Sequence, residues 1–264
     1  MKLEKAHKFG MFIDLDKCTG CGSCMVACMA ENNVPFREDE TDKLISVAWM
    51  RVYNLSNNKP FPDTETSFLP RPCQHCVGHH GHSPCVSVCP ATATADDANT
   101  GIVSQIYTRC FGCRYCMAAC PYHVRLFNWY DPVWPEGMEK SLNPNISVRM
   151  RGVVEKCSFC FHRYQLAKER ADYEGEEHLA EDAYQTACTQ ACPAKAIVFG
   201  DLNNPDHKVH QLAQPDNRNG GKPRAKNVFR LLEHLGTNPK VYYHSSKEWV
   251  RRLGDNDVTG RDKA

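Results

Sequence analysis

The stretch RCFGCRYCMAACPY, residues 109–122, carries four cysteines in the spacing C-x2-C-x2-C-x3-C-P. The 264-residue chain holds sixteen cysteines, and all of them fall into four such groups. Each group begins with C-x2-C and ends with C-x3-C, and only the middle spacer differs, so the groups form an internal repeat with insertions. In chain order, groups one to four are Cys18, Cys21, Cys24 and Cys28; Cys73, Cys76, Cys85 and Cys89; Cys110, Cys113, Cys116 and Cys120; and Cys157, Cys160, Cys188 and Cys192.

This spacing is typical of iron–sulfur ligation. Four thiolates on a short loop suit a soft tetrahedral metal or an iron–sulfur cube. In a C-x2-C-x2-C-x3-C-P run, three cysteines hold one [4Fe–4S] cluster and the fourth ligates another. Groups two and four keep the cysteine order with longer spacers, and no group has lost a cysteine. The sequence therefore predicts four [4Fe–4S] clusters.

Two other uses of cysteine fit the spacing less well. Zinc is held by paired C-x2-C knuckles and has no use for the third and fourth cysteines of each group. A zinc-stapled interaction protein is nevertheless the alternative from a different functional class. Disulfides would require all sixteen cysteines to pair, and thiols within one C-x2-C run pair poorly with each other.

The bulk composition excludes several function classes. A net charge of +1, from 32 basic and 31 acidic residues, does not favour nucleic acid or anionic lipid. The longest apolar runs are too short to span a bilayer, and residues 1–16 show neither an export signal nor a twin-arginine pair. No phosphate-binding loop, nucleophile–base arrangement or catalytic carboxylate pair stands out. We therefore expect an electron-transfer protein that is not a catalyst by itself.

Local patterns predict short elements around the cysteines. Each C-x3-C places two thiols one turn apart on a helix face, which predicts helices at about residues 24–30, 85–89, 116–120 and 188–192. Residues 91–106 are predicted to form two strands joined by a turn, and residues 194–202 and 240–244 to form strands. A charged helix is expected from residue 161. Residues 216–226 have the composition of a linker, and residues 227–236 form a periodic segment.

Group one ends differently from the other three. Groups two, three and four end in Cys-Pro, whereas group one ends in Cys28-Met29. Proline pushes the residue before it out of the helical region, so its absence lets the first helix continue. We expect this helix to run through Glu31 and to end at Asn32 and Asn33.

Several motifs together resemble a known family. The motifs are CTGCGSCMVACMAEN, PCQHC, CVSVCPATAT, RCFGCRYCMAACPY, RGVVEKCSFCFHR, CTQACPAKAIVFGDL and LLEHLGTNPKVYY, which cover most of residues 11–245. They resemble the four-cluster electron-transfer subunits of molybdopterin oxidoreductases, such as dimethyl sulfoxide, polysulfide and nitrate reductases. The resemblance implies an α+β fold of two interleaved bacterial-ferredoxin-like modules with long insertions. Module I is residues 8–60 plus 148–203, module II is residues 61–147, and residues 204–264 are a C-terminal extension for partner docking.

The resemblance also implies which cysteines share a cluster. Three cysteines of one group combine with the last cysteine of another. The expected ligand sets are Cys18, Cys21, Cys24 and Cys192 (cluster 1); Cys157, Cys160, Cys188 and Cys28 (cluster 2); Cys73, Cys76, Cys85 and Cys120 (cluster 3); and Cys110, Cys113, Cys116 and Cys89 (cluster 4).

In such proteins the clusters form a wire between partners. The resemblance implies a molybdopterin-type large subunit next to cluster 1 and an NrfD/PsrC-type membrane quinone-binding subunit next to cluster 4, with a multihaem cytochrome c as a further partner. LGTNPKVYY and the absence of a C-terminal membrane anchor resemble the subunits that dock on an NrfD/PsrC-type membrane protein, such as those of polysulfide reductase, alternative complex III and the menaquinone reductase (Qrc-type) complex. General similarity favours the last of these. The iron–sulfur subunit of a hydrogenase or formate dehydrogenase is the alternative within the same class. A peripheral location on the periplasmic face, after co-export with a twin-arginine partner, is expected, with the cytoplasmic face as the alternative.

Two sets of polar residues near the cysteines have alternative roles. His79, His80 and His82 lie in the spacer of group two, where a solvated loop is expected and a hydrogen bond that tunes the cluster is the alternative. The second set, expected near the membrane end, would contact a partner or tune a cluster, because positive charge raises a cluster's potential. It consists of Arg109, Arg114, Tyr122, His123 and Arg125.

Overall fold

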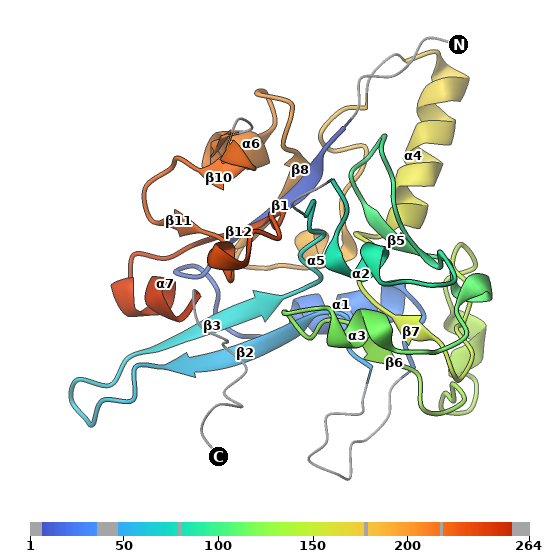
Figure 1. The fold of residues 1–264 in the computed structure, drawn as a ribbon, viewed down its shortest axis with the longest axis horizontal. Helices are drawn as coiled ribbons and strands as arrows, with labels where there is room; N and C mark the ends of the chain where they lie inside the picture. Colours follow the sequence, from blue (N-terminus) through green and yellow to red (C-terminus); the bar gives the residue numbers. More distant parts are fainter. Residues whose placement is uncertain (1–6, 36–46, 79–80, 177–178, 217–218, 255–264) are drawn as a thin grey trace.

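The computed structural model describes residues 7–35, 47–78, 81–176, 179–216 and 219–254, and its largest sheet has four strands. Its strand order is β11-β12-β1-β8 (Figure 1). β1 (Phe9–Asp14) pairs antiparallel with β8 (Ile197–Asp201) and parallel with β12 (Val241–His244). β11 (Val228–Phe229) closes the sheet on the outer side of β12. The sheet therefore joins a strand from the beginning of the chain to three strands from its last third.

β1 is buried on both faces, as its continuous apolar sequence FGMFID suggests. Met11 and Ile13 face the main core. Phe12 faces the other way and packs with Val209 of α6 (Lys208–Ala213). Helix α6 thus covers the face of the sheet that the main core leaves open.

In the described part of the chain, four two-stranded ribbons accompany the sheet. They pair β2 (Arg51–Ser56) with β3 (Thr66–Arg71), β4 (Thr94–Asp96) with β5 (Val103–Gln105), β6 (Leu126–Phe127) with β7 (Val154–Glu155), and β9 (Pro215–Asp216) with β10 (Lys222–Pro223). The β4–β5 hairpin confirms the two strands predicted within residues 91–106. The β6–β7 ribbon joins the segment after group three to the segment before group four.

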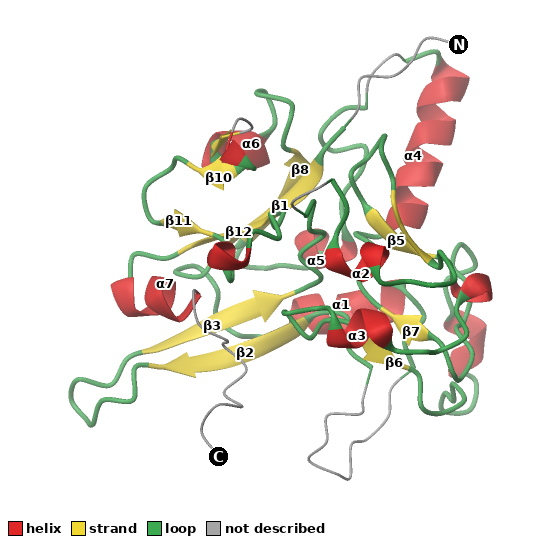
Figure 2. Ribbon diagram, viewed as in Figure 1, coloured by secondary structure: helices red, strands yellow, loops and turns green. Residues whose placement is uncertain are grey.

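All four helices predicted at the C-x3-C segments are present, and Figure 2 shows them in the middle of the molecule. Three of them are single turns that end before the Cys-Pro pair. Helix α1 packs against α5, and α2 packs against α3, so group one meets group four and group two meets group three. The bounds are Ser23–Glu31 for α1, Pro84–Ser87 for α2, Tyr115–Ala118 for α3 and Ala187–Gln190 for α5.

The end of α1 confirms the prediction for group one. The helix continues past Cys28 to Glu31, and Asn32 is its C-terminal cap. The Asn32 side-chain amide donates to the Cys28 carbonyl at 2.9 Å. Asn33 takes a left-handed conformation with φ 47°, which asparagine tolerates better than most residues.

The remaining predictions had mixed outcomes. The charged helix is present as α4 (Phe161–Glu174), and the strands predicted at residues 194–202 and 240–244 are β8 and β12. The expected linker contains β10 and overlaps the end of its partner β9, and the periodic segment forms β11 and a 3-10 turn. Helix α7 (Glu248–Gly254) was not predicted. Among the described residues, 3-10 turns lie at Tyr107–Arg109, Met138–Ser141 and Glu233–Leu235.

None of the helices in the described ranges combines the length and apolarity that crossing a bilayer requires.

Candidate metal centres

Two small cavities in the fold are each lined by four cysteines. In both, three of the thiols come from one group and the fourth from the other group of the pair. One cavity is lined by Cys73, Cys76, Cys85 and Cys120, and the other by Cys89, Cys110, Cys113 and Cys116. This sharing of cysteines follows from the packing of α2 on α3. Each of these helices carries one cysteine that lines one cavity, and the cysteine just after the helix lines the other cavity.

The thiols of groups one and four also come together. Burial, and then the negative charges of Cys157, Cys160 and Cys188, raise the pKa of Cys28 well above its usual value. Such repulsion requires the four sulfur atoms to be near neighbours in a poorly solvated place. Cys28 therefore lies with three cysteines of group four rather than with its own group.

The last set is centred on Cys24. Burial, and then Cys18, Cys192 and Cys21, raise the pKa of Cys24 to about 11. All sixteen cysteines are free thiols, and the four sets are the same as the ligand sets that the resemblance implies. The structure brings these thiols together, while ligation of a cluster by each set stays a prediction.

One backbone turn recurs in every group. The second spacer residue of each C-x2-C is left-handed, with φ of 72°, 44°, 78° and 54° at Gly20, His75, Gly112 and Phe159. Glycine adopts this conformation freely, whereas other residues incur about 1–2 kcal/mol. In groups two and four this strained position is therefore occupied by a residue with a large side chain, His75 or Phe159. These two side chains meet: the rings of His75 and Phe159 stack with centroids 3.7 Å apart.

Backbone N–H groups point at several of the sulfur atoms. Ala93 and Ala196, each four residues after the last cysteine of its group, donate to Cys89 and Cys192 at 3.3 Å. Such bonds favour the charged thiolate, which is the form that binds metal. Four neighbouring cysteines, with donors aimed at their sulfur atoms, form a donor set that fits an iron–sulfur cube.

Asn32 adds a side-chain donor to one set. Its amide lies 3.8 Å from the sulfur of Cys28 and 3.9 Å from that of Cys160. The residue is buried, so water does not compete for these contacts. The sequence predicted Asn32 only as a helix end; the signal for a second role is its position four residues after a cysteine.

Arg125 lies between the two cavities of groups two and three. It is buried, and its guanidinium donates to the Cys85 sulfur at 3.1 Å and to the Thr94 hydroxyl at 3.0 Å. Burial opposes the charge, but Cys85 and Cys116 hold the pKa of Arg125 above its ordinary value. Arg125 is therefore a permanent cation beside both sets of thiols.

The other four residues expected with Arg125 do not share its position. Tyr122 is buried and donates to the Leu231 carbonyl at 3.2 Å. Arg109, Arg114 and His123 are exposed. Contact with a partner is therefore open to these three, whereas Tyr122 and Arg125 can act only inside the fold.

The histidine-rich spacer of group two lies at the surface where it is described. His82 is exposed, and its Nδ1 is 3.3 Å from a carboxylate oxygen of Asp96. The Ser83 hydroxyl lies 3.4 Å from the Cys85 sulfur. The other two histidines, His79 and His80, lie outside the described residues.

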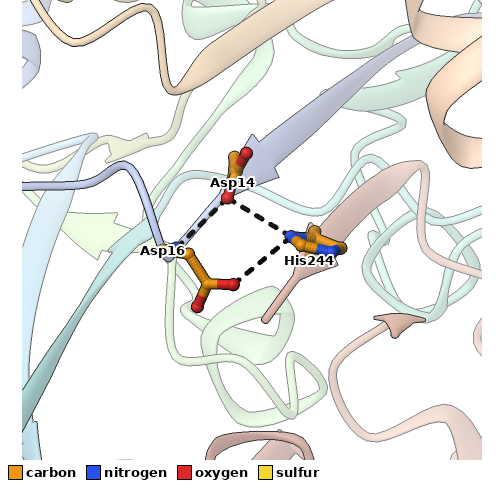
Figure 3. Close-up of side chains that lie close together, drawn as sticks. All are labelled: Asp14, Asp16 and His244. Atoms are coloured by element: carbon orange, nitrogen blue, oxygen red, sulfur yellow. Dashed lines mark hydrogen bonds and ion pairs between the residues drawn. The ribbon is translucent and has the colours of Figure 1, made fainter. Parts of the chain in front are cut away.

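A group of three polar side chains lies near the start of group one (Figure 3). Nδ1 of His244 is 3.3 Å from Asp14 and 3.7 Å from Asp16. The Ser246 N–H also donates to Asp16 at 2.7 Å. These bonds tie the end of β12 to the end of β1, which accounts for the group without a bound ion.

Comparison with known families identifies two matching domains. A family described as "4Fe-4S dicluster domain" matches residues 64–136, which contain groups two and three. A family described as "4Fe-4S binding domain" matches residues 9–30, which contain group one. Both matches favour iron–sulfur ligation over zinc.

Curated proteins resemble the chain over nearly its whole length. It is 58% identical to the menaquinone reductase iron–sulfur cluster-binding subunit of Nitratidesulfovibrio vulgaris, over 94% of the chain and 93% of that protein. It is 36% identical to the Hdr-like menaquinol oxidoreductase iron–sulfur subunit 1 of Archaeoglobus fulgidus, over 92% of the chain and 85% of that protein. It is 37% identical to a Halobacterium salinarum protein named as a dimethyl sulfoxide reductase iron–sulfur subunit, over 89% of the chain and 78% of that protein.

Proposed function

The chain belongs to the family of ferredoxin-type 4Fe–4S subunits that includes the iron–sulfur subunits of menaquinone, dimethyl sulfoxide, selenate and arsenate reductases, and we propose that it carries electrons through four [4Fe–4S] clusters in a menaquinone or quinone oxidoreductase. Its proposed partners are a molybdopterin-type large subunit and an NrfD/PsrC-type membrane subunit, with a multihaem cytochrome c as a further component. The observation that supports this most directly is the gathering of all sixteen cysteines into four sets of four.

We propose that each set holds one cluster. Clusters 1 and 2 would belong to module I and clusters 3 and 4 to module II, with the boundaries expected from the sequence. When bound, each cubane supplies reversible one-electron chemistry. The chain's own contribution is to hold the thiolates, to donate N–H groups to their sulfur atoms, and to place buried cations such as Arg125 beside them.

The first test is the metal content of anaerobically purified protein. Four intact clusters correspond to about 16 iron and 16 sulfide per chain, with broad brown absorption that bleaches on reduction. Replacing Ser158, the non-ligand neighbour of Cys157, with alanine should leave this content unchanged. Zinc in place of iron and sulfide would refute the proposal.

We further propose that the surface around group three is the contact with the membrane subunit. Large apolar side chains are exposed there: Phe111, Tyr115, Trp129 and Met150. Monomeric proteins rarely leave such side chains together in water unless another molecule covers them. We call these four residues the group-three surface.

Three loops of the chain meet to form the group-three surface. Gly112 packs so closely on the Gly152 carbonyl that a Cβ would lie 2.2 Å from the oxygen. Gly152 in turn donates its N–H to the Asn128 carbonyl at 2.8 Å. The guanidinium of Arg114 lies 5.1 Å from the centre of the Trp129 ring. The surface is therefore continuous, and the cavity of Cys110 and Cys113 lies directly beneath it.

Replacing Tyr115 and Met150 together with serine is expected to weaken binding to the membrane subunit. The two side chains are 63% and 59% exposed, so the fold should lose little stability, while loss of interface anchors costs about 2 kcal/mol or more, roughly 30-fold in affinity. Co-purification from detergent extracts measures the effect. Tyr173→Ser, at a residue of α4 that is 92% exposed, is the matched control. Unchanged co-purification of the double variant would place the contact elsewhere.

We propose a peripheral position on the periplasmic face of the membrane, reached by co-export with a twin-arginine partner, with the cytoplasmic face as the alternative. A protease added to spheroplasts or to inverted vesicles distinguishes the two faces.

A further inference from the structure

Lys156 is a buried lysine between two of the thiol sets. It directly precedes Cys157 and is only 1% exposed. Its ammonium donates to the Cys157 carbonyl at 2.7 Å and to the Val103 carbonyl. Val103 lines the cavity of the Cys73 set. The charge therefore lies where the cavity of cluster 3 meets a ligand of cluster 2.

No carboxylate neutralises this charge within the described residues. The nearest acidic residue in sequence, Glu155, is 3.1 Å from Arg149 and also accepts from the Trp49 indole at 3.0 Å. Among the described residues, the Lys156 ammonium donates to the carbonyl oxygens of Val103 and Cys157. Burial of an ammonium is costly unless an anion compensates it, so a compensating anion has to come from the thiolate sets themselves.

The surroundings of Lys156 make it the cation of this junction. The rings of His75 and Phe159 stack with centroids 3.7 Å apart, so the loops of groups two and four adjoin here. His75, whose Nδ1 accepts from the Val103 N–H at 3.1 Å, lies at the same place. Because this Nδ1 accepts a hydrogen bond, it carries no proton, so the imidazole is neutral and does not share the charge.

We propose that Lys156 sets the reduction potentials of the two clusters on either side of this junction, clusters 2 and 3. The proposal rests on the proposed function, since it requires both clusters to be present. A fixed positive charge favours whichever redox state is the more negative, which is the reduced state. The charge of Lys156 would thus stabilise an electron at the junction where the electron passes from one module to the other.

Lys156→Met and Lys156→Arg form the matched test. Redox titration of the intact complex, followed by electron paramagnetic resonance, measures the four midpoint potentials. In Lys156→Met, two of the four midpoint potentials should fall by about 59 mV each. For one electron this is a tenfold change in the ratio of reduced to oxidised cluster. In Lys156→Arg all four should stay near the wild-type values. Cys76→Ser and Cys160→Ser identify the shifted signals, because each alters one of them.

The outcomes separate this proposal from the proposed function. Four unchanged potentials in Lys156→Met, or four that shift equally, would overturn the role of Lys156. Lys156→Gln is the second uncharged variant; if neither uncharged variant assembles its clusters while Lys156→Arg does, Lys156 serves folding and the potential-setting role is rejected. Wild-type protein without iron and sulfide would instead refute the proposed function.

Discussion

Replacing Cys113 with serine is expected to lower quinone-linked turnover roughly 100-fold or more, since even residues that only support a metal ligand typically cost 10–100-fold. Cys113 lines the cavity beneath the group-three surface, at the proposed membrane end of the wire. Electrons supplied through the large subunit should still reduce the clusters that precede it. Cys113→Ser is therefore expected to interrupt electron transfer only at the membrane end of the wire.

Cys21→Ser is the matched control for this experiment. Cys21 occupies the equivalent second position of group one, at the proposed opposite end. Its substitution should block reduction from the large subunit and leave reduction from the quinone side intact. Rapid-freeze resonance spectra, with electrons supplied from each side in turn, measure both effects. If Cys113→Ser instead abolishes reduction of the whole chain from the large subunit, the proposed order is reversed.

Removal of iron is expected to unfold the protein. Binding at structural metal sites is worth about 10–16 kcal/mol for zinc, which matches or exceeds the roughly 5–15 kcal/mol by which a typical domain is stable. Helices α2, α3 and α5 have four residues each, far too few to be stable alone. Without the clusters, buried cations such as Arg125 would also lose the anionic groups that compensate their charge.

Acid should promote this loss. Burial and the neighbouring cysteines raise the pKa of the Cys120 thiol to about 11 and that of the Cys157 thiol to about 12. These thiols are then protonated at neutral pH, so binding of iron must release protons, and a lower pH favours the reverse reaction. Circular dichroism and iron release, followed while the pH is lowered, should change together. A metal-free protein that keeps its thermal transition would contradict the prediction.

The local part of the fold could be predicted from the sequence because its causes are local. Proline after Cys89, Cys120 and Cys192 stops three helices, and its absence after Cys28 lets α1 continue to Glu31. The β4–β5 hairpin likewise follows from its own turn residues. For the same reason, the grouping of cysteines and the kind of metal centre could be predicted before the fold was known.

Long-range pairing could not be predicted in this way. KVYYH has the composition of a strand, but nothing in it indicates parallel pairing with β1 about 230 residues earlier. Lys156 and His75 look like ordinary polar residues, and only tertiary packing buries them. The periodic segment at residues 227–236 was pulled into β11 and a 3-10 turn by its neighbours in the sheet.

The stacked rings of His75 and Phe159 have a consequence for the speed of electron transfer. Each ring lies on a left-handed turn beside its own pair of cysteines, and both are almost completely buried. The two loops can approach no closer than the thickness of the stack, with centroids 3.7 Å apart. Because tunnelling slows steeply with distance, the pair would act as a spacer of fixed thickness between the two halves of the proposed wire. A substitution that removes one ring would alter the pace of that crossing even if every cluster kept its ligands.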